Sequence, residues 1–300
     1  MILEIYEAYF STFRVLAAII LPFASILVLF LFFRRSSNPR FRSWSLGMMM
    51  LASIFFWLFV GLSLVLCYTL SELYEYQPEA AVRTVFGTVL LLAILGGLPL
   101  SLLLTRFSPR IVLAKVKNLS PPKPDTAIIF HALCRTMGVA DAELMISKTN
   151  VPISFAVEVQ KPIIVMSQKL LSLLKKDEIE AVMAHELAHV KNSDTTLKAM
   201  VTAYKTALPH DPIIRLIEAA FHREREMVAD ETAARTTEKP LSLASALLKI
   251  YRAFPKKDLG SYGTLSILGT GKTLLSRHPP LSQRVQQLVR LAEIYGSGAH

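Results

Sequence analysis

Three long apolar runs occupy most of the first hundred positions of the chain. Residues 15–33, 44–68 and 85–104 contain no charged side chain. Each approaches the ~20 residues that a helix needs to cross a hydrocarbon layer of about 30 Å. Pro22 and the pair Gly96 and Gly97 predict kinks or close contacts between helices. The pattern therefore predicts three N-terminal transmembrane helices.

Beyond residue 120 the apolar positions follow shorter patterns, typical of a folded domain. Residues 151–159 alternate between apolar and polar, which indicates a strand, and shorter strands are expected at 143–147 and 163–167. We expect a hairpin-like sheet whose outer strand offers an edge to an extended peptide. Helical patterns cover 125–137, capped by Asp125 and ended by Gly138, then 168–174, 195–208, 212–235 and 241–254.

A proline-rich stretch separates the two regions. Residues 120–125 contain three prolines in six positions, which favours an extended linker. We expect a transmembrane region at 1–119 and a second domain at 126–300. The predicted fold class is a membrane-anchored α+β protein, in which three transmembrane helices precede a mostly helical domain with a small β-sheet.

Composition and charge agree with a membrane protein. Hydrophobic residues make up 52% of the chain and charged residues 19%, which is more apolar than an ordinary soluble domain. Basic residues follow the first and third apolar runs: Arg34, Arg35, Arg40, Arg42, Arg106, Arg110, Lys115, Lys117 and Lys123. The positive-inside rule then predicts a multi-pass plasma-membrane protein with its N-terminus outside and the second domain in the cytoplasm.

The same features limit the partners. The net charge of +10 would place a basic surface against an anionic leaflet of the lipid bilayer. No compact basic stretch with interleaved aromatics occurs, so we expect no nucleic-acid partner. The first apolar run lacks a basic segment before it and is followed by arginines, which predicts a retained anchor instead of a cleaved signal peptide.

One short motif carries candidate chemistry. His185, Glu186 and His189 form the pattern H-E-x-x-H within a run of helix-forming residues. Side chains four positions apart share a helix face, so both imidazoles can bind one tetrahedral zinc ion. Glu186 lies beside the first histidine and can take a proton from a water molecule that the metal activates. The motif predicts metal-assisted hydrolysis, although so short a pattern also occurs by chance.

A catalytic zinc site needs a third protein ligand and keeps one position open. The segment 224–231 offers candidates, because Glu226 and Asp230 are four positions apart and share a helix face. Glu226 can bind the metal while Asp230 accepts a hydrogen bond from the far nitrogen of a ligand histidine. From spacing alone, Glu218 and Glu224 remain alternatives to Glu226.

Three motifs in this order resemble a known family. They are H-E-L-A-H-V-K-N-x-D at 185–194, E-x-x-A-D at 226–230 and H-P-P-x-x-x-R at 278–284. Together they are similar to the HtpX-type membrane zinc metalloproteases, which are related to the CAAX prenyl endopeptidases. The resemblance implies a zincin domain with one zinc ion per chain, bound by His185, His189 and Glu226.

The resemblance implies roles for further residues. Glu186 would be the catalytic base, Asp230 would support a ligand histidine, and His278 would stabilise the oxyanion. Arg284 would anchor the C-terminal segment to the active site. Substrate would lie against the predicted outer strand, at residues Ser154, Phe155 and Ala156. The family usually has Asn-Ala-Phe-Ala there, whereas this chain begins with Ile153, so its substrate contacts are expected to differ.

The interval between the two zinc motifs departs from the HtpX pattern. HtpX-type relatives place two membrane spans there, but this interval has no run of 18 apolar residues. Its charged and titratable residues are Lys198, Lys205, His210, Asp211, Arg215 and Glu218. We therefore expect a catalytic domain tethered only from its N-terminal side. The short interval also resembles the antirepressor-type peptidases of β-lactam sensor proteins, against which the H-P-P-x-x-x-R segment argues.

The predicted function is a membrane-bound zinc endopeptidase that cleaves membrane or misfolded proteins in quality control. One alternative is a regulatory protease that cleaves a single signalling partner. Another is a non-catalytic zinc-binding membrane adaptor. A structural zinc site is closed by a fourth protein ligand, so a fourth residue such as His222 or Glu224 would favour the adaptor.

Overall fold

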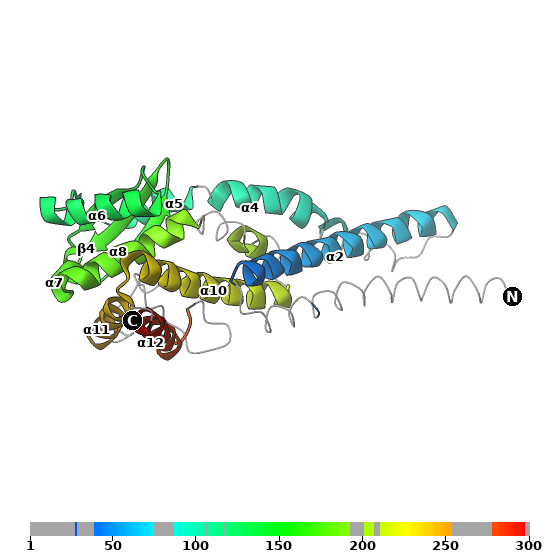
Figure 1. Cartoon of the computed structure of the whole chain (residues 1–300). Coiled ribbons are helices and arrows are strands. Elements are labelled where there is room, and N and C mark those ends of the chain that lie inside the picture. Colours follow the sequence, from blue (N-terminus) through cyan, green and yellow to red (C-terminus); the bar gives the residue numbers. More distant parts are fainter. Residues whose placement is uncertain are drawn as a thin grey trace. The chain divides into compact units, whose positions relative to one another are not determined.

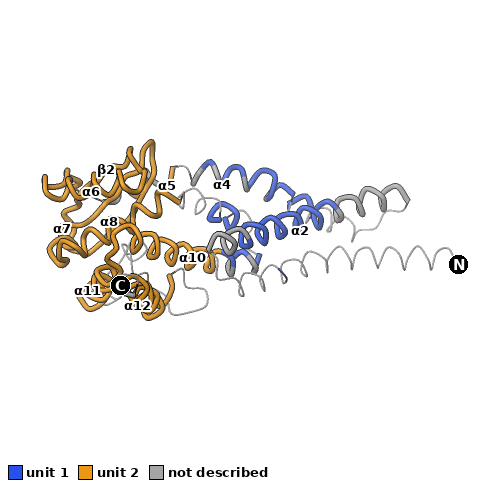
Figure 2. Tube along the Cα trace, viewed as in Figure 1, with its two compact units in different colours: residues 1–103, 201–217 blue, residues 104–200, 218–300 orange. Residues whose placement is uncertain are grey.

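The protein is mostly helical, with one small mixed β-sheet (Figure 1). A computed structural model describes residues 28, 39–74, 87–89, 91–105, 107–116, 118–192, 201–206, 211–253 and 278–297. The chain divides into two compact units, coloured in Figure 2. The first comprises residues 1–103 and 201–217, and the second comprises 104–200 and 218–300.

This division does not follow the bounds expected for the two domains, which stay a prediction. Residues 201–217, between the two zinc motifs, group with the N-terminal residues in the first unit. The helix α10 (Pro212–Thr237) therefore begins in the first unit and continues in the second. The sequence predicted a single connection, on the N-terminal side of the catalytic domain, and did not predict that α10 would also connect the two units.

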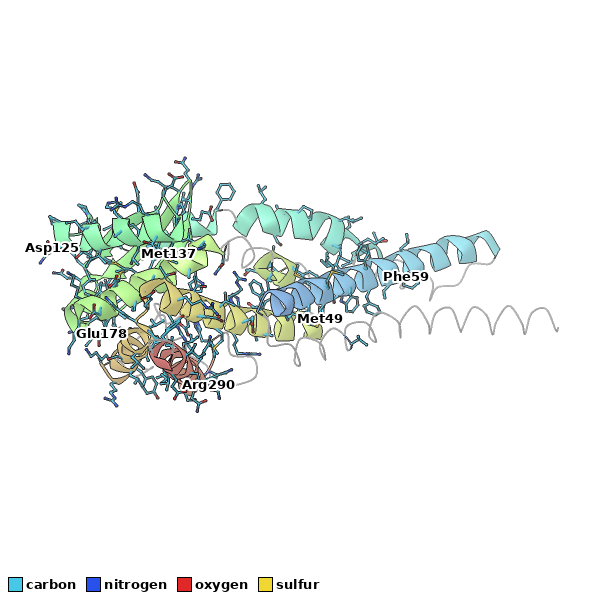
Figure 3. All side chains as sticks on the ribbon, in the orientation of Figure 1. Met49, Phe59, Asp125, Met137, Glu178 and Arg290 are labelled. Carbon is cyan, nitrogen blue, oxygen red and sulfur yellow. The ribbon has the colours of Figure 1, made fainter. Side chains whose placement is uncertain are left out.

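One helix dominates the first unit. Helix α2 (Pro39–Tyr74) contains the window 45–62. Within the described parts of the chain, this is the one helix long and apolar enough to cross a membrane by length and composition. It coincides with the second predicted span. Large apolar side chains, including Phe55 and Phe59, are exposed along it; Phe59 is labelled in Figure 3.

The third predicted span is only partly described, and it contains shorter helical pieces. The π-helix η1 (Ala93–Gly97) leads into α4 (Leu98–Thr105). The π-turn includes Gly96 and Gly97, where a kink was predicted, and such turns commonly bend a helix. A Cβ at Gly61 of α2 would lie 3.0 Å from side-chain atoms of Leu91, so glycine permits close helix contact at that position. Apart from residue 28, the first predicted span and Pro22 lie outside the described residues.

A buried polar cluster joins distant parts of the first unit. The hydroxyls of Ser53 and Tyr204 both donate to Oδ2 of Asp211, at 2.6 Å and 2.8 Å. All three residues are buried, and Asp211 directly precedes α10. The charged interval between the zinc motifs is thus hydrogen-bonded to α2.

The second unit contains a four-stranded sheet with the order β1-β2-β4-β3. Its strands are β1 (Leu119–Ser120), β2 (Glu143–Ser147), β3 (Ser154–Glu158) and β4 (Pro162–Ser167). Strands β3 and β4 form the predicted hairpin, and β3 is an outer strand of the sheet. The parallel pairing of β2 with β4 and the short β1 at the other edge were not predicted.

Helices cover both faces of this sheet. The main core packs α6 (Pro124–Met137), α7 (Gln168–Leu173) and α8 (Lys176–Lys191) against one face, together with α11 (Pro240–Ala253) and α12 (Leu281–Ser297). The other face carries a smaller apolar cluster beside α5 (Ser108–Lys115). Gly138 ends α6 with a φ of 72°, a conformation that glycine adopts without strain.

One predicted helix boundary is wrong by two positions. The N-cap of α6 is Lys123, and Asp125 lies in the first helical turn. Pro124 occupies the first helical position, where its missing N–H costs no hydrogen bond. Asp125 therefore acts through its charge near the helix N-terminus instead of as a cap.

Candidate metal centre

Helix α8 presents the H-E-x-x-H motif inside the main core. One hydrogen bond fixes its first turn, because a Glu178 carboxylate oxygen accepts from the Lys175 backbone N–H at 2.7 Å. His185, Glu186 and His189 are all buried. The Nε2 atoms of the two histidines lie 3.2 Å apart, as expected for side chains one helical turn apart.

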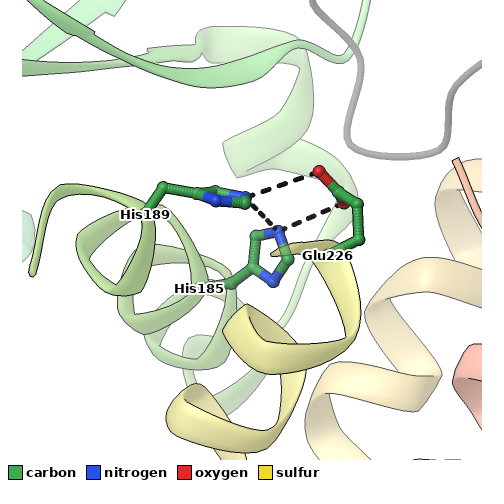
Figure 4. A group of neighbouring side chains, drawn as sticks. All are labelled: His185, His189 and Glu226. Carbon is green, nitrogen blue, oxygen red and sulfur yellow. Dashed lines mark hydrogen bonds and ion pairs between the residues drawn. The ribbon is translucent and has the colours of Figure 1, made fainter. Parts of the chain in front are cut away.

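Helix α10 supplies the third donor. The Glu226 carboxylate faces both imidazoles (Figure 4), with Oε1 lying 3.5 Å from Nε2 of His189 and Oε2 3.7 Å from Nε2 of His185. The donor atoms of these residues all lie within 4.8 Å of one another. The structure thus brings the three predicted ligands together from two helices.

The spacing of these atoms fits a bound metal ion. Tetrahedral bonds of about 2.0–2.1 Å place two ligand atoms about 3.3 Å apart, close to the three separations above. Oε2 of Glu226 is buried and makes no hydrogen bond with any described residue. A buried carboxylate oxygen without a hydrogen bond is costly; Nη1 of Arg284 lies 3.3 Å away, and a metal ion would provide a closer ligand contact. Two imidazoles and one carboxylate are a common donor set for catalytic zinc.

A buried ion pair contacts the nitrogen of His185 that faces away from the other two donors. Its Nδ1 lies 2.9 Å from Oδ1 of Asp230. Arg284 of α12 donates to both oxygens of Asp230, at 2.6 Å and 2.7 Å. Burial alone would raise the pKa of Asp230, but the Arg284 and His185 interactions outweigh it and lower the pKa below its ordinary value. The Asp230 carboxylate therefore lies against Nδ1 of His185, on the opposite side of the ring from Nε2.

The C-terminal segment also reaches the Glu226 carboxylate. Nη1 of Arg284 lies 3.3 Å from Oε2 of Glu226, and Nδ1 of His278 lies 3.7 Å from the same oxygen. Burial would raise the pKa of Glu226, but hydrogen bonding and electrostatic interaction with His278, and electrostatic interactions with His189 and Arg284, hold the pKa well below its ordinary value. His278 is partly exposed, whereas Glu226 is buried.

The alternative ligands do not join the donor group. Glu218, His222 and Glu224 are buried on α10. Among the described residues, the one grouping of His, Cys, Asp or Glu donors close enough to hold an ion is His185, His189 and Glu226. Neither His222 nor Glu224 supplies the fourth ligand that a closed structural site would need.

The predicted substrate strand lies beside the motif helix but divides its side chains between two faces. Strand β3 packs on α8, and Ala156 contacts the main core that contains α8. Ser154 is buried, and none of the described residues hydrogen-bonds its hydroxyl. Phe155 instead points into the smaller cluster with Val157, because successive side chains alternate across a strand. The Phe155 side chain is thus packed away from the main core, and its substrate role stays a prediction.

Two supporting interactions were not found from the sequence. Arg225 donates to the backbone oxygen of Asn192 at 3.1 Å, which links α10 to the end of α8. Ser245 and Lys249 of α11 donate to Glu178 at 2.8 Å and 2.7 Å. Both join segments far apart in the chain, so helix periodicity gives no signal for either.

Known proteins resemble this chain over most of its length. The family model "BlaR1 peptidase M56" matches residues 74–258. The Protease HtpX homolog of Pyrococcus abyssi (strain GE5 / Orsay) is 30% identical over 213 residues, which cover 56% of this chain and 74% of the relative. The Protease HtpX homolog of Gemmatimonas aurantiaca is 27% identical over 257 residues, covering 69% of this chain and 90% of the relative.

A solved structure is also similar. The crystal structure of S. mikatae Ste24p aligns with 82% of this chain and 66% of its own, at 15% identity and a TM-score of 0.46. The predicted HtpX-type relationship is confirmed by the sequence relatives. The H-P-P-x-x-x-R segment argued against the antirepressor-type peptidases of β-lactam sensor proteins. The matching family model ends at residue 258, before that segment begins, so the segment does not count against the family match.

Proposed function

The chain belongs to the BlaR1 peptidase M56 family and is a metallopeptidase, and from this premise we propose that it is a membrane-bound zinc endopeptidase. The observation that carries the proposal is the separation of 3.2 to 3.7 Å among the donor atoms of His185, His189 and Glu226. Family membership favours an enzyme over a non-catalytic adaptor.

His185, His189 and Glu226 would hold one zinc ion. When bound, zinc lowers the pKa of a coordinated water molecule and polarises the scissile carbonyl. Nδ1 of His185 lies 2.9 Å from Oδ1 of Asp230, and a hydrogen bond donated there would keep the proton on Nδ1 and leave the Nε2 lone pair for the metal. Arg284 pairs with both Asp230 and Glu226, and its positive charge favours the ionised form of each buried carboxylate.

Glu186 is the proposed general base. It follows His185 in the chain and is buried beside the donor group. Its carboxylate would take a proton from the attacking water and then deliver it to the leaving amine. His278, partly exposed next to Glu226, would donate a hydrogen bond to the oxygen of the scissile carbonyl as negative charge develops there.

The substrate would be an extended segment of a membrane or misfolded protein. Strand β3 supports this proposal, because it is an outer strand beside α8 and has a backbone edge that is not paired with β4. An extended peptide can add to such an edge through main-chain hydrogen bonds. Helix α2 and the basic segments support a multi-pass plasma-membrane protein with a cytoplasmic active site.

One substitution tests the catalytic assignment. Glu186→Gln preserves size but cannot accept the proton, so we expect wild-type metal content and at least a ~100-fold loss of cleavage of an unfolded protein such as casein. Glu180→Gln, on the same helix but paired with Lys239 at the surface, is the matched control and should retain both properties. Wild-type cleavage by Glu186→Gln would remove Glu186 from the mechanism.

A regulatory protease with one signalling partner is the second candidate. The match to the BlaR1 family model favours it. Comparison of proteins cleaved by the wild type and by Glu186→Gln separates the candidates. A housekeeping enzyme should degrade many unfolded membrane proteins, whereas a regulatory enzyme should cut one protein at one site.

A further inference from the structure

Helix α5 has one buried face and one exposed apolar face. Val112, Leu113 and Val116 pack against the smaller apolar cluster of the sheet. On the exposed side, Phe107, which directly precedes the helix, is 47% exposed, and Ile111 is 56% exposed. Residues 107 and 111 are four apart, so they lie on the same side, one turn from each other.

Cationic side chains accompany these exposed apolar residues. The guanidinium of Arg110 lies 5.9 Å from the centre of the Phe107 ring, an arrangement that keeps its charge beside an apolar surface. The stretch 106–123 contains Arg106, Arg110, Lys115, Lys117 and Lys123 and no acidic residue. Apolar side chains flanked only by positive charge suit the boundary between acyl chains and anionic headgroups.

The chain reaches α5 directly from an apolar segment. Helix α4 ends at Thr105, and Leu100 and Leu103 on it are more than half exposed. Only Arg106 and Phe107 separate α4 from α5. A basic residue at the end of an apolar helix marks the cytoplasmic membrane surface under the positive-inside rule.

We propose that the surface formed by Phe107, Arg110 and Ile111 docks on the anionic headgroup layer of the membrane. Phe107 and Ile111 enter the boundary with the acyl chains, and Arg110 binds lipid phosphate. The proposal rests on the membrane association proposed above and adds a specific lipid contact made by the peptidase unit.

This contact would restrain the substrate strand. The buried face of α5 packs against a cluster that contains Phe155 and Val157 of β3 and Val165 of β4. The outer strand beside α8 is therefore backed by the same helix that binds lipid. A peptidase held in this way favours substrate segments that lie close to the membrane surface.

Site-specific fluorescence tests the lipid contact in the full-length chain. Cys67 and Cys134, its two cysteines, are replaced by serine, and single cysteines labelled with an NBD fluorophore are introduced as Ile111→Cys, Ile128→Cys or Phe55→Cys. Ile128 lies on α6, which packs in the main core on the opposite face of the sheet, and is 68% exposed, so it is the matched control. Phe55, exposed on α2, reports membrane insertion itself.

The proteins are reconstituted in vesicles of phosphatidylcholine alone or with about 30 mol% phosphatidylglycerol. In anionic vesicles we expect the label at 111 to shift to shorter wavelength, with iodide quenching roughly threefold weaker than at 128. Adding Arg110→Glu should restore quenching at 111. Each labelled protein must elute as a single monodisperse peak in size-exclusion chromatography, as expected for a folded protein.

The outcomes separate the two proposals. Equal quenching at 111 and 128, with the label at 55 protected, would overturn the lipid contact while leaving membrane insertion intact. A label at 55 open to iodide would overturn membrane insertion. Protection at 111 that persists in detergent and increases with protein concentration would mean contact with a second copy, which also contradicts the proposal.

Discussion

At the scale of single residues, the metal site depends on buried charges that are paired across helices. Arg284 contacts both Asp230 and Glu226, and Asp230 contacts His185. All four residues are buried, so loss of one partner would leave another charge unpaired at a cost of several kcal/mol. Arg284 of α12 thus supplies the positive charge that pairs with the two buried carboxylates of α10.

Glu178 (Figure 3) shows the same principle away from the site. Burial by itself would raise its pKa, but the hydrogen bonds from Lys249, Lys175 and Ser245 outweigh burial and lower the pKa below 4.5. A carboxylate with a lowered folded-state pKa contributes stability that is fully present above its unfolded value. That stability is lost as the pH falls below about 4.5 toward the folded value.

We predict that Glu178→Gln lowers the free energy of unfolding at pH 7 by about 1–3 kcal/mol, because the ammonium of Lys249 then lacks its charged acceptor. The deficit relative to wild type should shrink as the pH falls below 4.5. Denaturant unfolding at several pH values measures both effects. Glu180→Gln, which removes only a surface pair with Lys239, should cost less than about 1 kcal/mol. A deficit that is constant with pH would contradict the assigned ion pair.

At the scale of elements, the sequence predicted what local periodicity encodes. The H-E-x-x-H helix, the alternating strand β3 and helices α7, α10 and α11 lie within a few residues of their predicted bounds. The helix predicted at 195–208 is described only at residues 201–206, and α12 was not predicted. Glu226 was one of three open candidates on spacing alone. The structure singles out Glu226 because the packing of α10 on α8 is a tertiary property, which includes the Arg225 contact with Asn192.

Pairings between distant segments were beyond the reach of the sequence pattern. The parallel pairing of β2 with β4 depends on a chain crossover that strand periodicity does not reveal. The charges between the zinc motifs argued against a further long apolar span there, which stays a prediction. They gave no sign that Asp211 would be buried against Ser53 and Tyr204.

That cluster gives a prediction about the beginning of α10. Asp211→Ala removes the acceptor of two buried hydroxyl hydrogen bonds, so we expect a loss of about 2 kcal/mol in stability. A lower unfolding midpoint in detergent, measured by scanning fluorimetry, checks it. Thr206→Ala removes an exposed hydroxyl bonded within its own helix and should leave the midpoint unchanged. Equal midpoints for both variants would mean that the cluster contributes no stability.

At the scale of the whole molecule, the chain joins a peptidase unit to an apolar unit through more than one segment. Residues near 104 connect the units, and α10 continues from one into the other. The helix that begins at Pro212, directly after Asp211, also carries Glu226 and Asp230. The metal centre is therefore linked covalently to the first unit through a continuous helix.

The central claim is that two helices, α8 and α10, supply three side chains to a single zinc ion. The most direct measurement is the zinc content of the purified full-length protein after dialysis against a weak chelator. We predict about one zinc per chain in the wild type and in Glu224→Ala, a buried carboxylate on the same helix, and at least tenfold less in Glu226→Ala. Full zinc retention by Glu226→Ala, or loss from Glu224→Ala alone, would contradict the account.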